Sequence, residues 1–496
     1  MPALSIALAF SPIALCGVVI LLLRRSAVIG ALAGIALAAL LIALDSRFEL
    51  QASRLLEALG ATAILTLSAA LVIVPGLYLN ATLRGQGILD DLVEWIQALP
   101  LSAEHKALML LLGLLPAIEA LTGFGVSLFL GVPIFFRLFA ADQAYRLSML
   151  GMNIMPWGTL ALATVVGASL SGTALTPLGS RTALTSALVF PLIGLVALFV
   201  IGGVALLRKQ ALWALAIGGG LSAALYLFNR LGLTETAGIL AGALMGLLAF
   251  LCFRRRSETA PTPPNPAARA RKFWMFLPYV LVLVLILLTR TVPVLHDFLA
   301  QAWVLSSARI KLSVLASPGI VLALVCLFLQ WLRPATIDHR ALWSRVRIAC
   351  LGLLCFILLA QVMNAAGMVA AISTALQQWT GDARMLLLLA PALGMFSGFI
   401  TGSNLSGNAL LINVQQQIGE QSGQGLLFAA LQNSAAGHSV FTSLPIIVLI
   451  MTIARDADKH AQPSRSAEHD LLNFGLKTAV LVYLALVTAV SLLSFY

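Results

Sequence analysis

Long runs of apolar residues recur along this chain, separated by short stretches in which polar and charged residues gather. A helix that crosses the hydrocarbon core of a bilayer, about 30 Å thick, needs roughly 20 mostly apolar residues. The continuous runs of about this length are residues 3–23, 28–44, 60–79, 186–207, 211–228, 236–253, 273–292, 317–332, 348–373 and 474–495. The pattern therefore predicts a series of membrane-spanning helices.

Gly, Pro, Asn and Ser interrupt three further apolar regions, residues 107–136, 147–178 and 385–453. Membrane helices tolerate such residues where neighbouring protein or trapped water satisfies the freed backbone groups. Depending on how the interrupted regions cross, the chain makes about 12 to 14 spans. The sequence therefore predicts an all-α polytopic membrane protein of about 12 to 14 transmembrane helices, in two repeated halves with discontinuous helices.

The composition agrees with a chain that meets lipid directly. Hydrophobic residues are 60% of the 496 and charged residues only 10%, whereas a soluble domain carries roughly 25% charged residues. An ordinary water-soluble enzyme is excluded, because too few hydrophilic residues remain to cover a core of this size. The net charge of +11 comes from short basic clusters between apolar runs, which indicates membrane topology and not nucleic-acid binding.

Motifs that would indicate an enzyme are missing from the sequence. The five cysteines form no C-x-x-C pair and have no histidine at ligand spacing, so we expect buried thiols and neither a metal nor a cofactor. No H-E-x-x-H, G-x-S-x-G or Walker pattern occurs. A membrane-embedded enzyme would need paired acids or a metal set, and an ion channel would need a symmetric filter motif. We therefore expect neither of these classes.

A basic, Pro-rich stretch divides the chain near its middle. Residues 254–272 hold six basic residues against one acid, and basic residues in short loops mark the cytoplasmic side. We predict a flexible cytoplasmic linker, residues 253–272. It would join an N-terminal transmembrane half, residues 1–252, to a C-terminal transmembrane half, residues 273–496.

The first apolar run, residues 3–23, has no basic region before it, and Arg24 and Arg25 follow it. This is the reverse of a cleavable signal peptide. We therefore expect a first membrane span with the N-terminus outside. Between two later runs, residues 89–96 mix acidic and apolar side chains, and we expect an interfacial helix there.

A short internal repeat coincides with the interrupted regions. The pattern P-A-x4-T-G-F, which begins at Pro116, recurs as P-A-x4-S-G-F from Pro391, and further helix breakers follow both copies. A second broken segment follows in each half, around Asn153 and around Asn433. Chance could produce so short a match in a chain rich in Leu, Ala and Gly. The alternative is a duplicated fold whose discontinuous helices surround a transporter's binding site near the middle of the membrane.

A helix break inside lipid frees backbone N–H and C=O groups, and each costs several kcal/mol unless protein, water or substrate satisfies it. The N–H groups at the start of a half helix carry about half a positive charge, which suits a carboxylate. We therefore expect substrate to bind where the helices break. The candidate substrate-binding residues are Thr122, Gly123, Phe124, Gly125, Asn153, Gly402, Ser403, Asn404, Ser406, Asn408 and Asn433.

Glu119 and His438 are the candidates for carrying a coupling proton. Glu119 lies between the half helices of an apolar region, where a charged acid costs about 2.5–3.5 kcal/mol. It either takes up a proton and carries it, or it bonds to the break for structural reasons. His438 either titrates and donates to an anion or packs as a satisfied histidine. Arg181 could attract a carboxylate, but we favour an anchor at the outer interface.

At these breaks the sequence resembles the lactate permease family of bacterial secondary transporters. Residues 119–125, E-A-L-T-G-F-G, are similar to the family's E-G-A-A-G-F-G, and residues 401–410, T-G-S-N-L-S-G-N-A-L, are similar to its T-G-S-D-T-S-S-N-A-L. Residues 153–156 resemble its N-T-A-P, and Asn433 with Pro445 has the spacing of its late Asn-to-Pro segment. Weaker likeness extends over nearly the whole chain.

The resemblance implies a multi-pass symporter that imports lactate, and glycolate or related 2-hydroxy monocarboxylates, with protons across the bacterial inner membrane. By matching position it assigns the site to Glu119, residues 123–125, Ser403, Asn404 and Asn408. Asn404 nevertheless replaces an acid of the family, and an aromatic residue, Phe441, stands near the family's late lysine. Losing one negative and one positive group keeps the net charge of the site but changes its contacts with the substrate. The two departures therefore affect the assignment of lactate as the substrate more than the assignment of monocarboxylate transport.

One alternative function stays open, a proton- or sodium-coupled carrier of another small organic anion such as a dicarboxylate or a sulfonate. Small hydroxyl and amide side chains beside unwound backbone also coordinate sodium. The expected partners are a small monocarboxylate, the proton and membrane lipid, without nucleic acid. The sequence leaves the coupling ion, the exact anion and assembly into a homo-oligomer open.

Overall fold

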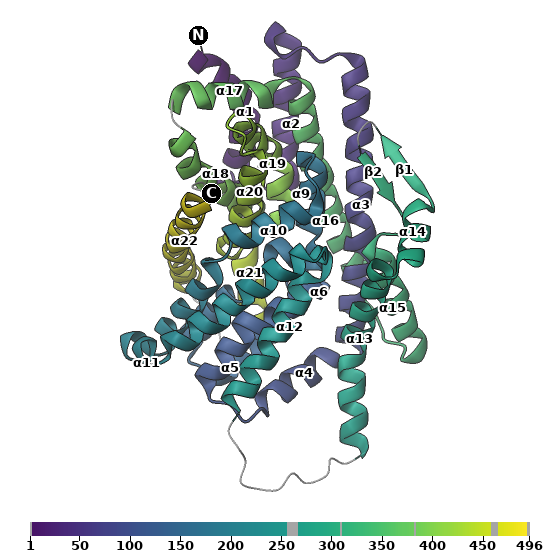
Figure 1. The fold of residues 1–496 in the computed structure, drawn as a ribbon, viewed down its shortest axis with the longest axis vertical. Coiled ribbons are helices and arrows are strands. Elements are labelled where there is room, and N and C mark those ends of the chain that lie inside the picture. Colours follow the sequence, from purple (N-terminus) through teal and green to yellow (C-terminus); the bar gives the residue numbers. More distant parts are fainter. Residues whose placement is uncertain (1, 255–265, 308–309, 381–382, 458–464, 494–496) are drawn as a thin grey trace.

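The structure is a computed structural model that describes residues 2–254, 266–307, 310–380, 383–457 and 465–493. Helices make up nearly all of it (Figure 1), which confirms the prediction of an all-α polytopic membrane protein. In the described ranges the exception is one antiparallel hairpin, formed by β1 (Val304–Ser307) and β2 (Ile310–Ser313). The sequence analysis did not predict this hairpin.

The helices of the N-terminal half are α1 (Pro2–Leu21), α2 (Ala27–Leu44), α3 (Ala52–Gly85), α4 (Ile88–Gln97), α5 (Ala103–Met109), α6 (Leu115–Thr122), α7 (Val126–Leu138), α8 (Ala141–Leu150), α9 (Gly158–Ser171), α10 (Leu175–Thr185), α11 (Val189–Arg230) and α12 (Thr234–Phe253). Those of the C-terminal half are α13 (Pro266–Thr291), α14 (Pro293–Gln301), α15 (Pro318–Leu332), α16 (His339–Ala365), α17 (Met368–Thr380), α18 (Ala383–Thr401), α19 (Asn404–Glu420), α20 (Gly425–Ser439), α21 (Leu444–Ala457) and α22 (Arg465–Leu493). The single-turn helices are η1 (Ser46–Phe48), η2 (Leu110–Leu114, a π-helix), η3 (Met155–Trp157) and η4 (Val440–Thr442).

Eight helices of the described ranges are long and apolar enough to cross a bilayer, or up to ten if each of two bent pairs makes one span. The apolar helices that fall short of this length are Ile6–Leu21, Val126–Leu138, Pro318–Leu332 and Met385–Thr401. The sequence estimate of about 12 to 14 counted such pieces as spans. It also divided α11 into two spans, and the structure agrees in that α11 consists of two helices joined across a kink at Gly202 and Gly203, where the backbone is non-helical.

The two predicted second breaks are present as sharp bends. Ala141–Leu150 and Met155–Ser171 meet at 51°, and Gly425–Thr442 and Leu444–Asp456 meet at 42°. The first bend falls at Asn153 and Pro156, and the second falls at Ser443, next to Pro445 and beyond Asn433. Each half of the chain therefore holds a bent pair of helices beside its main break.

Most of the predicted linker, residues 255–265, lies outside the described residues. Next to it, Arg271 of α13 contacts Asp91 and Glu94 of α4 at 2.5 and 2.7 Å. Helix α4 occupies the stretch where the sequence predicts an interfacial helix, and its apolar side chains are buried while its acids face outward. The linker end of α13 is thus fixed to the surface helix α4.

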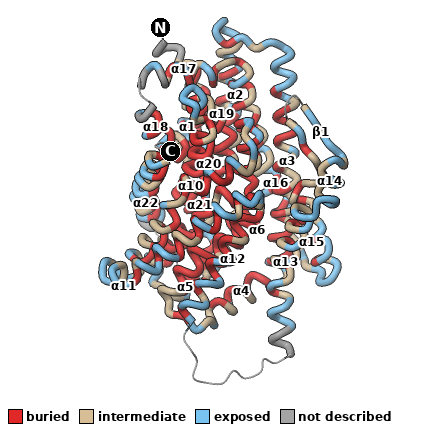
Figure 2. Tube along the Cα trace, in the orientation of Figure 1, coloured by how far each residue is buried: buried red, intermediate tan, exposed pale blue. Residues whose placement is uncertain are grey.

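The helices that carry the candidate residues form the buried centre of the molecule (Figure 2). Helices α9 and α10 of the N-terminal half pack against α19 and α20 of the C-terminal half, and their facing side chains are almost all buried. The surrounding helices expose large apolar side chains, as helices in contact with lipid do. The two halves therefore meet at the breaks and share one core.

Glycines let α12 lie against the helix that ends at the first break. A Cβ built on Gly242 would lie 2.6 Å from the backbone nitrogen of Ala117, and one built on Gly113 would lie 2.5 Å from Cα of Gly246. Small residues at helix contacts allow this approach in membranes, where packing rather than exclusion from water holds helices together. The close contact fixes α6 and thus the position of Glu119.

We predict that Gly242→Ala lowers the free energy of unfolding in mixed detergent micelles by about 1–3 kcal/mol, because the added methyl group forces α12 away from α6. The matched control is Gly219→Ala in α11, where an added Cβ meets nothing within 4 Å. Alanine favours the helix by about 1 kcal/mol over glycine, so this control should be neutral or stabilising. Equal effects of the two substitutions would contradict the packing account.

Candidate functional site

The first break separates α6 from α7 with three consecutive residues in the left-handed region. Gly123, Phe124 and Gly125 have φ values of 67°, 57° and 76°. The buried carboxylate of Glu119 reaches across this break and accepts hydrogen bonds from the backbone nitrogens of Gly125 (3.1 Å) and Ser127 (3.2 Å) and from Oγ of Ser127 (2.7 Å). Glu119 thereby satisfies the N–H groups at the start of α7 with its own negative charge.

A second left-handed turn packs against the first. Thr159, Leu160 and Ala161, at the start of α9, have φ values of 48°, 57° and 55°. Each costs about 1–2 kcal/mol for a residue with a side chain. A Cβ on Gly123 would overlap the hydroxyl of Thr159, so glycine is required there both for its φ and for this contact. Buried backbone strain of this kind gathers at functional sites.

The second break separates α18 from α19 at Gly402, whose φ is 64°. Ser403 caps α19, and its Oγ accepts from the backbone nitrogen of Ser406 at 3.4 Å. The repeat pattern placed the equivalent of Gly123 at Gly398, but Gly398 is helical within α18. A side chain on Gly398 would overlap the backbone of α20 at Ala436, so this glycine serves close packing and the break falls four residues later.

Asn433 of α20 is the centre of a buried hydrogen-bond network at the second break. Its Oδ1 accepts from Nδ2 of Asn404 (3.1 Å) and of Asn408 (2.8 Å). Its Nδ2 donates to the hydroxyls of Thr164 in α9 (2.8 Å) and Thr182 in α10 (3.1 Å). One side chain therefore joins helices of both halves of the chain.

The network continues along α20 to His438. Oγ of Ser434 lies 2.5 Å from Oγ1 of Thr185 and 3.0 Å from Oγ of Ser186. Nε2 of His438 lies 2.9 Å from the same Ser186 hydroxyl, and its ring meets Phe190 edge to face. His438 is buried, so it belongs to the polar core between the halves and is not a surface group.

The predicted site residues thus fall into two groups. Glu119, Gly123, Phe124 and Gly125 form the first break, where the Phe124 ring also packs against α3 at Gly76. The hydrogen bonds of Thr122 and Asn153 go to backbone carbonyls, so both hold helices in place. The second group lies at the second break and comprises Gly402, Ser403, Asn404, Ser406, Asn408, Asn433 and His438.

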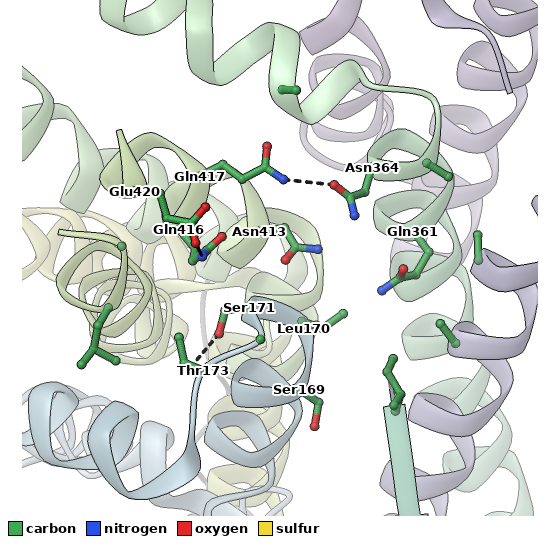
Figure 3. Close-up of a pocket in the computed structure, with 18 of the residues that line it drawn as sticks. Ser169, Leu170, Ser171, Thr173, Gln361, Asn364, Asn413, Gln416, Gln417 and Glu420 are labelled. Atoms are coloured by element: carbon green, nitrogen blue, oxygen red, sulfur yellow. Dashed lines mark hydrogen bonds between the residues drawn. The ribbon is translucent and has the colours of Figure 1, made fainter. Parts of the chain in front are cut away.

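A polar cavity of about 1040 Å³ lies between α3, α9, α16 and α19 (Figure 3). We call it the vestibule. Gln361 of α16 faces Asn413 of α19 across it, and beside them Nε2 of Gln417 donates to Oδ1 of Asn364 at 3.1 Å. The exposed Arg54 and Glu57, near the start of α3, also line it.

The sequence analysis missed the vestibule, although one signal for it was available. Helix α19 carries amides on an otherwise apolar stretch, at Asn413, Gln415, Gln416 and Gln417. A membrane helix with this many amides has to face protein or water.

A second cavity, of about 700 Å³, lies at the other end of α3. It is lined by Arg84 at the C-terminal end of α3, by α4, by α7 and by α21. The guanidinium of Arg84 stacks 4.4 Å above the Phe129 ring, and the acids Asp90 and Glu94 of α4 also line the space. We call this the inner cavity, and it mixes both signs of charge.

The residues that the structure describes include no group of three or more His, Cys, Asp or Glu side chains that could hold a metal ion. The free thiols of this part of the chain lie on four helices, with Cys350 and Cys355 both on α16, and Cys16, Cys326 and Cys355 are buried. The polar chemistry of the site is therefore that of amides, hydroxyls, one carboxylate and one imidazole.

Residues 310–496 match the family model described as L-lactate permease. The resemblance to the lactate permease family is confirmed. The match supports a lactate transporter in general and not an enzyme. It includes the second break with Asn404, Asn408, Asn433 and His438, whereas Glu119 lies outside the matched residues. No curated protein matches the chain.

We predict that Glu119 and Ser127 act as one unit in holding the first break. Ser127→Ala and Glu119→Gln should each lower the free energy of unfolding by roughly 1.5–3 kcal/mol, because each removes a buried hydrogen bond to a charged group. The double variant should lose less than the sum of the single losses. Ser169→Ala, which removes an exposed hydroxyl bonded within α9, is the control and should be near neutral. Additive losses would contradict the prediction.

Proposed function

We propose that this protein is a secondary active transporter that imports lactate, and glycolate or related 2-hydroxy monocarboxylates, with protons across the bacterial inner membrane. One observation carries the proposal: a buried polar network joins the broken helices of both halves between two cavities. Together with the family match, this arrangement supports alternating access to a site at the breaks.

The two cavities lie at opposite ends of one unbroken helix. Glu57 in the vestibule and Arg84 in the inner cavity are both on α3, and at 1.5 Å per residue they stand roughly 40 Å apart. This separation is comparable to the full thickness of a bilayer, about 40–45 Å with its headgroups. In the transport path that we propose, a solute crosses between the cavities past the buried network.

The charges near the cavities support an orientation. Arg271, next to the basic linker, contacts acids of α4 at the inner cavity, and basic loops stay in the cytoplasm. We therefore assign the inner cavity to the cytoplasmic face and the vestibule to the outside. In this assignment the N-terminus lies outside.

Glu119 offers a mechanism for coupling a proton to the movement of a helix. As a carboxylate it accepts from Gly125 and from both the backbone and the hydroxyl of Ser127. Protonation removes the charge that holds these groups and turns one carboxyl oxygen into a donor. The start of α7 is then released, and the left-handed turns at 123–125 and 159–161 can rearrange.

His438 is the second group we assign to proton coupling. It lies on the same helix as Asn433, and its ring reaches the hydroxyl of Ser186. From Ser186 a chain of hydroxyls leads to Ser434, which bonds to the backbone carbonyl of Thr182, the residue whose hydroxyl contacts Asn433. This chain could pass a proton to or from the substrate site.

We predict that the purified protein in proteoliposomes accumulates labelled lactate under an imposed inward proton gradient. Accumulation should persist when sodium is left out, because protons supply the driving force. Lactate accumulation that needs sodium would favour the alternative, a sodium-coupled carrier of an organic anion. Absence of lactate uptake under either gradient would refute the proposed function.

We predict that Glu119→Gln abolishes proton-driven accumulation while lactate exchange across the membrane continues. Glutamine keeps the size of the side chain but cannot gain or lose the proton, so only the coupled step is lost. Measuring uptake and exchange on the same proteoliposome preparation separates the two. Equal loss of both would show that Glu119 serves the structure of the break alone.

We predict that the vestibule is reached from outside the cell. Asn413→Cys, in a background with the exposed Cys252 replaced by serine, should react with a membrane-impermeant maleimide on intact cells and lose lactate uptake. The matched control is Asp90→Cys in the inner cavity, which should react only after the membrane is permeabilised. The reverse pattern of labelling would overturn the assigned orientation.

A further inference from the structure

Two buried amide oxygens at the second break have no hydrogen-bond donor. Asn404 is 1% exposed and Asn408 is 0% exposed, and Oδ1 of each lies in the structure without a partner. The two residues are one turn apart on α19, so they lie on the same face of that helix. An unsatisfied buried acceptor costs free energy that a suitable ligand would recover.

The surrounding hydrogen bonds fix which end of each amide is unpaired. Nδ2 of Asn408 donates to the carbonyl of Ala163 at 3.0 Å, and a carbonyl accepts only from the N–H₂ end. Thr164 gives its hydroxyl proton to the carbonyl of Pro156 at 2.5 Å, so it must accept from Nδ2 of Asn433. Oδ1 of Asn433 then faces Asn404 and Asn408 and holds the Nδ2 atoms of both.

The sequence places Asn404 and Asn408 among the residues expected to bind a carboxylate. Both N–H groups of the Asn408 amide and one N–H group of the Asn404 amide are instead bonded to the protein, and the Oδ1 atoms of the two residues are unpaired acceptors. A bare carboxylate brings only further acceptors and cannot satisfy them. The ligand group that fits has to be a hydrogen-bond donor.

The electrostatics of the second break favour a neutral donor over a cation. The two acceptors lie in the first turns of α19, at the positive end of its dipole. The side chain that bonds to both residues, Asn433, is uncharged, and so are its own partners Thr164 and Thr182. A cation would therefore lack a counter-charge among these residues, whereas an O–H group needs none.

We infer that Asn404 and Asn408 recognise the 2-hydroxyl group of a 2-hydroxy acid. The hydroxyl has one proton, which it shares between the two Oδ1 atoms in a three-centre hydrogen bond, and the carboxylate on the neighbouring carbon faces the N–H groups of the first turn of α19. This inference rests on the proposed function and assigns its selectivity for hydroxy acids to two side chains. A site built to bind a hydroxyl rejects the analogue that lacks it, because the buried acceptors are then left unpaired.

The test compares the uptake of L-lactate and of propionate, which differ by this hydroxyl group, in proteoliposomes. The unmodified protein should prefer lactate, and Asn404→Leu should reduce that preference roughly tenfold or more by removing a paired acceptor at similar volume. Asn408→Leu should act in the same direction. Asn404→Leu is the primary variant because it breaks one hydrogen bond, whereas Asn408→Leu also breaks the contact with Ala163.

Thr182→Val is the matched control. It disturbs the same network by removing a hydroxyl that accepts from Asn433, but it removes no unpaired acceptor. Uptake of lactate and of propionate should then fall together, with their ratio unchanged. A variant that folds can still transport too slowly for the uptake assay. For such a variant, the preference for lactate over propionate is measured as the stabilisation of the detergent-solubilised protein on binding each acid.

The outcomes separate this inference from the proposed function. Lactate uptake by the unmodified protein with an unchanged lactate-to-propionate ratio in both asparagine variants would overturn the inference alone. A sodium requirement for uptake by the unmodified protein that is lost in Asn404→Leu would also overturn the inference. It would show that the two oxygens belong to a cation site. No uptake of lactate by the unmodified protein would overturn both.

Discussion

The amide of Asn433 is the contact on which the centre of this protein depends. A broken helix inside a membrane has to satisfy its freed polar groups internally, and here one side chain serves helices α9, α10 and α19 from its place on α20. Its oxygen and its nitrogen each make two hydrogen bonds, so its capacity is fully used. The two halves of the chain are therefore held together through a polar group and not through apolar packing alone.

The first break is built on the opposite principle. There a charged group, Glu119, closes the gap by binding the exposed backbone of α7, and two left-handed turns press against each other beside it. Strained backbone of this kind persists only where the surroundings hold it. The two breaks thus differ. The break at Gly402 is held by uncharged amides and leaves two buried acceptors unpaired, whereas the break at residues 123–125 is strained and is held by a carboxyl group, which we propose to be the group that a proton alters.

The sequence predicted the class of fold, the breaks at residues 123–125 and near residue 402, and both bent pairs, because Gly, Pro and Asn interrupt long apolar runs there. Within the repeat, Gly398 matches Gly123, but the break falls at Gly402, because Gly398 is needed for close helix contact. The hairpin β1–β2 was missed because its strands are four residues each and lack a clear alternation of apolar and polar positions. The hydrogen-bond partner of each amide could not be predicted from the sequence either, because residues far apart in sequence determine which end of the Asn404 amide stays unpaired.

Helix α3 borders both the vestibule and the inner cavity along a single continuous rod of 34 residues. If a straight helix tilts about its midpoint, its two ends move in opposite directions. Tilting this rod against the core therefore closes the space at one end as it widens the space at the other. In the alternating access that we propose, such a tilt of α3 opens the two cavities in turn, so that no separate gate is needed at each face.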